Sequence, residues 1–167
     1  MILGMSTPTF TVVHVIISLI GIVSGVVVVF GMVRAHRCAG WTALFLVTTV
    51  LTSVTGFFFH SEHFGPPHAF GVISLVVLAV AIPALYVYRL AGSWRWVYVA
   101  GAVLALYLNV FVGVVQAFEK LPFLRRLAPT QSESPFVVAQ LIVMAIFVLF
   151  GILAVMRFRP MAPVAVI

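Results

Sequence analysis

Charge, and acidic charge above all, is scarce in this sequence. Only 7% of its 167 residues are charged, three of them are acidic, and none is an aspartate. Soluble globular domains carry roughly 25% charged residues, so this chain has too little polar surface to be stable in water. Without Asp there is no Ser-His-Asp set, and no helix carries paired carboxylates. Catalysis without a bound cofactor is therefore not expected.

Cysteine and clustered positive charge are also scarce. The single cysteine, Cys38, excludes a disulfide framework within the chain and a Cys-Cys redox pair. The nine Lys and Arg residues outnumber the acidic ones, but they occur in ones and twos and form no basic run. A nucleic-acid partner, which needs a basic patch, is therefore not expected.

Long apolar segments are abundant instead, and the mean hydropathy is +1.29. A membrane-spanning helix needs roughly 20 predominantly apolar residues. Five segments qualify: Phe10–Val33, Trp41–Phe59, Ala69–Tyr88, Val97–Phe118 and Phe136–Met156. We predict an all-α fold, a transmembrane helical bundle of five spans in the lipid bilayer. It forms one domain over residues 1–159, with a flexible tail at 160–167.

The distribution of Lys and Arg predicts the orientation of the bundle. Six arginines lie after the first segment, between the third and fourth, and after the fifth, whereas the opposite side has only Lys120, Arg125 and Arg126. Cytoplasmic connections are enriched in Lys and Arg. We therefore expect the N-terminus outside and the C-terminus inside, with Cys38 on the cytoplasmic side.

Polar side chains inside the segments lie mostly in the outer half of the predicted membrane. They are Asn109 and Gln116 on one face of the fourth segment, with Thr55, His14 and Gln140 on three others. A polar group in hydrocarbon must find a partner or line a cavity. One interpretation is helix packing, with hydrogen bonds across helices. The other is an outward-facing pocket in which these five residues bind a ligand.

Two local signals indicate how helices pack and begin. Gly21 and Gly25, four residues apart on the first segment, predict close packing inside the bundle rather than dimerisation. Ser134 stands before Pro135, and we predict that it is the N-cap of the last helix.

A histidine-rich connection, "FFFHSEHFGPPH" at 57–68, joins the second and third segments. His60, Glu62, His63 and His68 offer nitrogen and oxygen atoms of the kind that bind Zn, Cu, Fe or Mn. Their spacing is not specific for a metal, so three interpretations stay open. They are a site for a divalent metal or haem, a patch that titrates near the histidine pKa of about 6.5, and an ordinary solvated loop.

Two further stretches, "LYLNVFVGVVQAF" and "LAPTQSESPF", carry a family resemblance. With "TGFFF" and "LAGSWRWVYV", they make most of residues 41–155 similar to a family of small, uncharacterised bacterial inner-membrane proteins. The resemblance implies one polytopic helical domain in a bacterial cytoplasmic membrane and no known activity. It directs attention to Asn109, Gln116, Gln140 and the turn at 128–135, with Thr130 and Gln131 in it. A histidine-rich connection is not part of the family pattern.

Three function classes follow. The first is a membrane protein with a periplasm-facing polar pocket for a small polar ligand, an ion or a lipid headgroup, acting as a carrier, transporter or sensor. The second is a non-catalytic accessory or assembly subunit of a larger membrane complex, with partner subunits or further copies of itself. The third is a metal- or haem-binding redox protein that uses the histidines between His60 and His68.

Overall fold

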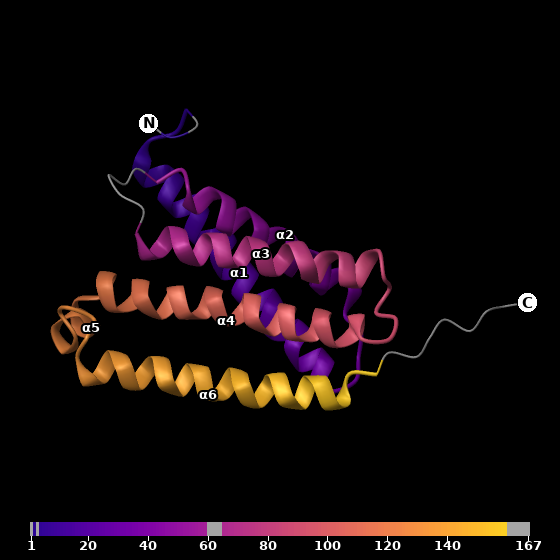
Figure 1. The fold of residues 1–167 in the computed structure, drawn as a ribbon. Coiled ribbons are helices and arrows are strands. Elements are labelled where there is room, and N and C mark those ends of the chain that lie inside the picture. The colour runs from indigo at the N-terminus through magenta and orange to yellow at the C-terminus, as the bar shows by residue number, and fades with distance from the viewer. Residues whose placement is uncertain (1, 3, 60–64, 160–167) are drawn as a thin grey trace, which may run out of the picture.

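The structure, a computed structural model, describes residues 2, 4–59 and 65–159. The described residues form six helices and no strand: α1 (Thr7–Val33), α2 (Ala39–Gly56), α3 (Pro66–Tyr86), α4 (Trp94–Lys120), α5 (Pro122–Leu127) and α6 (Ser134–Arg157) (Figure 1). All except α5 are long and apolar enough to cross a membrane. The predicted all-α bundle with five candidate spans, expected of a multi-pass membrane protein, is confirmed.

Successive long helices run in alternating directions, so the bundle has two distinct ends (Figure 1). At one end, called here the arginine-rich end, α1, α3 and α6 finish and α2 and α4 begin. Six arginines lie there: Arg34, Arg37, Arg89, Arg95, Arg157 and Arg159. The opposite end, called here the loop end, carries the start of α1, α5 and the turn before α6. The predicted segregation of basic residues is therefore present, while the orientation in a membrane stays a prediction.

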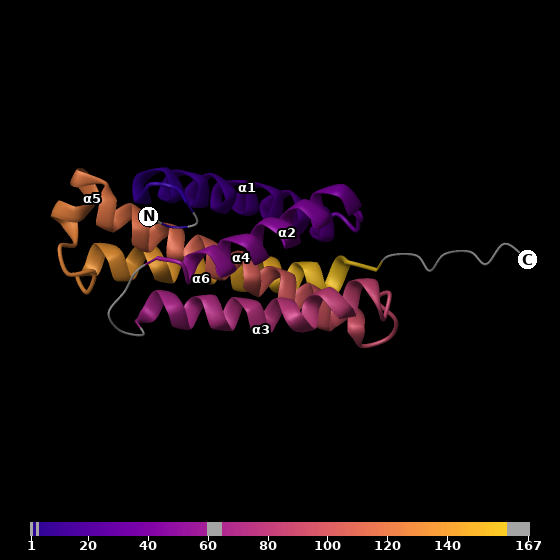
Figure 2. The same ribbon diagram turned by 90° about the horizontal axis from the view of Figure 1, so that it is seen from above.

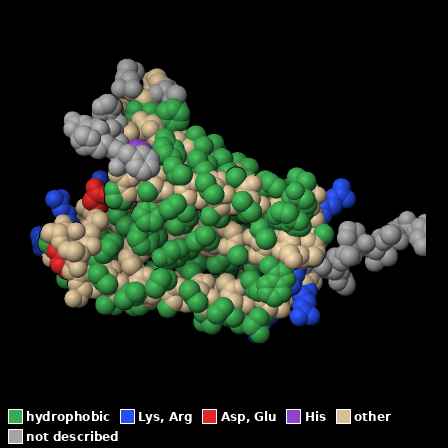
Figure 3. Space-filling view, viewed as in Figure 1, with side chains coloured by type: hydrophobic (Ala, Val, Ile, Leu, Met, Phe, Trp, Pro, Cys, Tyr) green, Lys and Arg blue, Asp and Glu red, His purple; other side chains and the backbone are tan. Residues whose placement is uncertain are grey.

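Helix α4 is the central element of the bundle. It packs against α1, α2, α3 and α6, whereas α6 packs mainly on α4 and α1 (Figures 1 and 2). Only 6% of the most apolar window of α6 is buried, against 39% for α4. Apolar side chains cover the middle of the molecule and charged ones gather at its two ends (Figure 3). This distribution suits a surface that is solvated by lipid along its length and by water at both ends.

Small residues set how closely the central helices approach. Gly25 of α1 faces Leu106 of α4 and Phe45 of α2, and a Cβ there would lie 2.6 Å from the Leu106 side chain and 2.8 Å from the Phe45 ring. Gly21 faces Thr48 and Asn109 in the same way, with 3.2 Å and 3.6 Å to their polar atoms. The prediction that the two glycines pack inside the bundle is confirmed.

Candidate functional site

His14 and Thr55 join α1 to α2 near the loop end. Their Nδ1 and Oγ1 atoms are 2.7 Å apart, and Thr55 donates its hydroxyl proton to the Leu51 carbonyl at 2.6 Å. A threonine hydroxyl has one proton to give, so this arrangement assigns the proton of the neutral imidazole to Nδ1, which donates to Thr55. The edge of the His14 ring also meets Phe59, with centroids 5.1 Å apart. The prediction from sequence named both residues, and the structure brings them together as a pair.

Asn109 lies in a second polar cluster, near the middle of α4. Its Nδ2 donates to Oγ1 of Thr49 at 3.2 Å, and Thr49 is fully buried. The missing side chain of Gly21 leaves room for this contact between α1, α2 and α4. One turn further along the same face of α2, the hydroxyls of Ser53 and of Ser74 on α3 lie 2.9 Å apart and share a hydrogen bond. Such contacts are those that the packing interpretation predicts.

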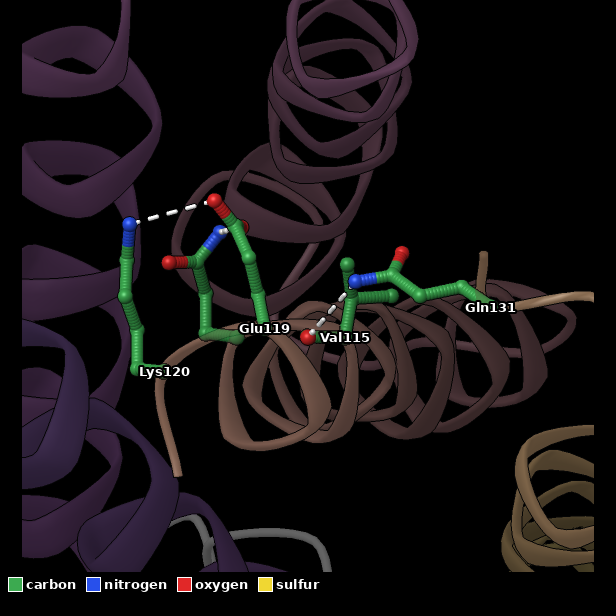
Figure 4. Close-up of polar contacts among 5 residues, drawn as sticks. Val115, Glu119, Lys120 and Gln131 are labelled. Carbon is green, nitrogen blue, oxygen red and sulfur yellow. Dashed lines mark hydrogen bonds and ion pairs between the residues drawn. The ribbon is translucent and has the colours of Figure 1, made fainter. Parts of the chain in front are cut away.

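Gln116 lies apart from these clusters, on the exposed surface of the loop end. Its Nε2 donates to Glu119 at 3.3 Å, and Lys120 forms an ion pair with the same carboxylate at 3.1 Å. Gln131 approaches the helix from the turn before α6 and donates to the Val115 carbonyl at 3.4 Å (Figure 4). The exposed ion pair between Lys120 and Glu119 contributes about 0–1 kcal/mol to stability.

Gln140 ties α6 to α4. Its Nε2 donates to the Phe111 carbonyl at 3.2 Å, and the side chain is 8% exposed. The other amide atom, Oε1, is buried with no hydrogen-bond partner among the described residues. Val115 and Phe111 are one turn apart on α4, so Gln131 and Gln140 hold the start of α6 against one face of that helix.

The five predicted ligand-binding residues therefore occupy four different places. His14 and Thr55 form a pair, Asn109 belongs to a central cluster, Gln116 is on the surface and Gln140 lies between α4 and α6. None of them lines either of the two cavities described below. Whether they bind a ligand stays a prediction.

The predicted metal ligands fall mostly outside the described residues. This is the case for His60, Glu62 and His63. His68 lies in the first turn of α3, where its Nδ1 accepts a hydrogen bond from the Gly65 amide at 3.3 Å. Within residues 2, 4–59 and 65–159, no three His, Cys, Asp or Glu side chains come together. The divalent-metal or haem interpretation stays a prediction.

Glu133 organises the turn before α6. Its Oε1 accepts hydrogen bonds from the Thr130 amide at 3.1 Å and the Thr130 hydroxyl at 2.9 Å, and its Oε2 accepts one from the Ser132 amide at 3.1 Å. The N-cap of α6 is Glu133, and Ser134 is already the first helical residue. The prediction that Ser134 caps the helix is wrong, because the last residue with extended backbone is Glu133 and the helix already begins at Ser134.

Protonation of Glu133 should loosen this turn. Desolvation acts to raise the pKa of the Glu133 carboxyl, but the hydrogen bonds from Thr130 and Ser132 outweigh it and lower the pKa below its usual 4.5. A lowered pKa in the folded state means that the stabilisation is complete above the usual pKa and is lost as the pH falls through the folded-state pKa. We expect the amide NMR signals of Thr130 and Ser132 to shift together with a midpoint below 4.5. Glu133→Gln should abolish that shift, and a midpoint above 4.5 would contradict the hydrogen-bond pattern.

A groove of about 480 Å³ lies between α4 and α6. Its lining comes from residues between 100 and 107 of α4 and between 144 and 156 of α6, and Tyr107 is the only lining residue whose side chain carries a hydroxyl, amide or charged group. A second cavity, of about 30 Å³, lies at the arginine-rich end beside Tyr98 and has room for about one water molecule. Of these two cavities, the α4–α6 groove is the one with room for a ligand.

Polar contacts hold α6 to α4 at both ends of this groove. At the loop end these are the bonds of Gln131 and Gln140. At the arginine-rich end, Nη1 of Arg95 donates to the Val155 carbonyl at 3.2 Å and to the Phe158 carbonyl. Between these ties the two helices stay in contact, since the rings of Tyr107 and Phe147 have centroids 5.7 Å apart, and the groove runs along their shared surface.

Sequence reasoning missed three features of the site. Thr49, Ser53 and Ser74 carry buried interhelical contacts, although Thr49 and Ser53 stand four apart on one helix face and that spacing was a usable signal. Arg95 was interpreted only as a marker of orientation. The groove itself has no sequence signal, because it depends on the distance between two helices.

Comparisons of the chain with protein-family models, with curated proteins and with solved structures find no match, so membership of the family that the sequence resembles stays a prediction.

Proposed function

We propose that this chain is a multi-pass protein of a bacterial cytoplasmic membrane that binds a membrane lipid between α4 and α6, as a non-enzymatic carrier or sensor. The observation that carries the proposal is the apolar groove of about 480 Å³ between these helices. The sequence left a small polar ligand, an ion and a lipid headgroup open as candidate ligands. Of these classes, a lipid agrees best with an apolar groove.

The chemistry of the groove favours a hydrocarbon chain over an ion or a small polar molecule. A polar group that is buried without a hydrogen bond costs roughly 1–3 kcal/mol by mutational measures, and an unpaired charge costs far more. Tyr107 alone offers a hydrogen-bonding side chain in the lining. A volume of this size lies within the roughly 300–1,000 Å³ of ligand pockets, and a dry apolar space is filled favourably by apolar groups.

Glycine at position 151 helps to keep the groove open. Gly151 lines it on α6, and a Cβ there would lie 3.5 Å from Val103 on α4, which is an ordinary contact distance. A Cβ at 151 therefore fits without forcing the two backbones apart, and the further atoms of a larger side chain would compete with a ligand for the space of the groove. This makes the position suitable for blocking a bound chain.

Gly151→Leu should remove most of the lipid that stays bound to the purified protein. The protein would be extracted in detergent and exposed to a phospholipid mixture, and bound lipid would be counted by native mass spectrometry. We expect a several-fold loss in Gly151→Leu, because the new side chain occupies the space of the hydrocarbon chain. Ala145→Leu adds a similar side chain to the exposed surface of α6, outside the groove lining, and should bind like the wild type. Equal binding by all three proteins would refute the proposal.

An accessory subunit is the second candidate, and the slight burial of α6 favours it. A transmembrane helix of a partner would cover the same helices that a lipid would. A photo-cross-linking side chain at Ile152, which lines the groove, separates the two in native membranes. A product heavier by one lipid supports the first proposal, and a product heavier by a whole polypeptide supports the second.

A further inference from the structure

We infer that the lipid bound in the α4–α6 groove is an anionic phospholipid and that Arg95 binds its headgroup, an inference that rests on the function proposed above. The arginine lies where the groove reaches the arginine-rich end. Its Nη1 donates to the Val155 carbonyl at 3.2 Å, and Val155 lines the groove. A chain in the groove would thus place its headgroup at the guanidinium.

The guanidinium keeps hydrogen-bonding capacity for such a headgroup. Arginine has five N–H donors, and the hydrogen bonds of Arg95 to described residues, to the Val155 and Phe158 carbonyls, use Nη1 alone. The side chain is half-buried, and its Cζ lies 5.0 Å from the ring centroid of Trp96, itself 53% exposed. These contacts orient the planar group and leave Nε and Nη2 for the oxygens of a phosphate, which arginine binds with two parallel bonds.

The charge of Arg95 has no anion to balance it within the part of the chain that the structure describes. The one ion pair found there joins Lys120 to Glu119 at the loop end. Of the three acidic residues in the chain, Glu119 and Glu133 lie at the loop end, and Glu62 lies outside the described residues, between the end of α2 and the start of α3. Six arginines therefore gather at the other end with no acidic side chain among the described residues there, and an anionic lipid supplies the missing charge.

The experiment measures headgroup preference. Purified protein would be mixed with equal amounts of phosphatidylglycerol and phosphatidylcholine of identical chains, and the ratio of the two bound lipids would be read by native mass spectrometry. We expect a preference for phosphatidylglycerol of about fivefold in the wild type, the value of one favourable charge contact at the membrane surface. Arg95→Gln should bring the ratio close to one, whereas Arg95→Lys should keep part of the preference.

The controls separate this inference from a structural defect and from the proposed function. Arg95→Gln also removes the hydrogen bonds that tie α4 to α6. This structural loss by itself lowers the binding of both lipids to the same extent, so a change in their ratio reports the lost headgroup contact. Arg89→Gln removes an exposed arginine at the same end and should keep the wild-type ratio. An unchanged ratio in Arg95→Gln, or no preference in the wild type, overturns the inference. If both lipids bind equally and Gly151→Leu removes both, the groove binds lipid but Arg95 does not select the headgroup. If Gly151→Leu removes neither lipid, the proposed lipid binding in the groove is itself wrong.

Discussion

Gly101→Ala should lower the free energy of unfolding by about 1–3 kcal/mol, the usual cost of inserting a methyl group into a packed core. A Cβ at Gly101 of α4 would lie 2.8 Å from the Cβ of Ala81 on α3. Ala81 is fully buried, and its methyl group has no torsion by which it can move aside. The two helices must separate instead, and their contacts along α3 and α4 weaken. Equilibrium unfolding in mixed micelles, followed by circular dichroism, measures the change.

Two control variants isolate the contact that causes this loss. Gly113→Ala lies on the same helix, where a Cβ would meet only Ile22 at 3.6 Å, so it should be neutral or stabilising through the higher helix propensity of alanine. In the double variant Ala81→Gly with Gly101→Ala, the methyl group moves from α3 to α4 and the clash is gone. We expect the double variant to recover much of the stability that Gly101→Ala loses. Strictly additive effects of the two changes would show that the residues do not meet.

Cysteine labelling should give an all-or-none result for the two ends of the bundle. In a Cys38→Ser background, a membrane-impermeant maleimide added outside should label Ser132→Cys at the loop end and leave His36→Cys at the arginine-rich end unlabelled. Both positions are exposed, so access to them depends on the membrane alone. The physical reason is the retention of arginine-rich connections on the cytoplasmic side.

Permeabilised membranes provide the reference for this measurement. His36→Cys should become labelled there as fully as Ser132→Cys, which shows that the thiol is reactive. The reverse pattern in intact membranes would place the six arginines outside. The headgroup site at Arg95 would then lie in the other leaflet, although its contacts within the bundle would be unchanged.

The helices themselves were predictable from the sequence because hydrophobic length is a local property. The predicted segment Phe10–Val33 became Thr7–Val33, and Phe136–Met156 became Ser134–Arg157. The shifts at the starts have local causes, since prolines stand at the second position of α1 and of α6, where a missing N–H costs nothing. The close packing of Gly21 and Gly25 was predictable for a similar reason, since four residues return to the same side of a helix.

The partners of the polar residues were less predictable. Thr48, Thr52 and Thr55 recur along one side of α2, yet the hydroxyl that meets Asn109 belongs to Thr49, one residue after Thr48. A rotation of one residue about the axis is about 100°, and helix periodicity alone does not say which side of α2 faces α4. That side follows from the packing of α1 and α3 on the same helix.

The sequence by itself determined that this protein is built from membrane-length helices with basic residues gathered at one end, because both properties depend on composition along the chain. Only the tertiary structure decided that the polar residues pair across helices, and that α6 is tied to α4 at its two ends with an apolar groove between. Those features depend on how far apart two helices lie and which faces they turn to each other. Helix separation is set by many side chains at once, of which Gly151 and Arg95 are two that no local pattern distinguishes.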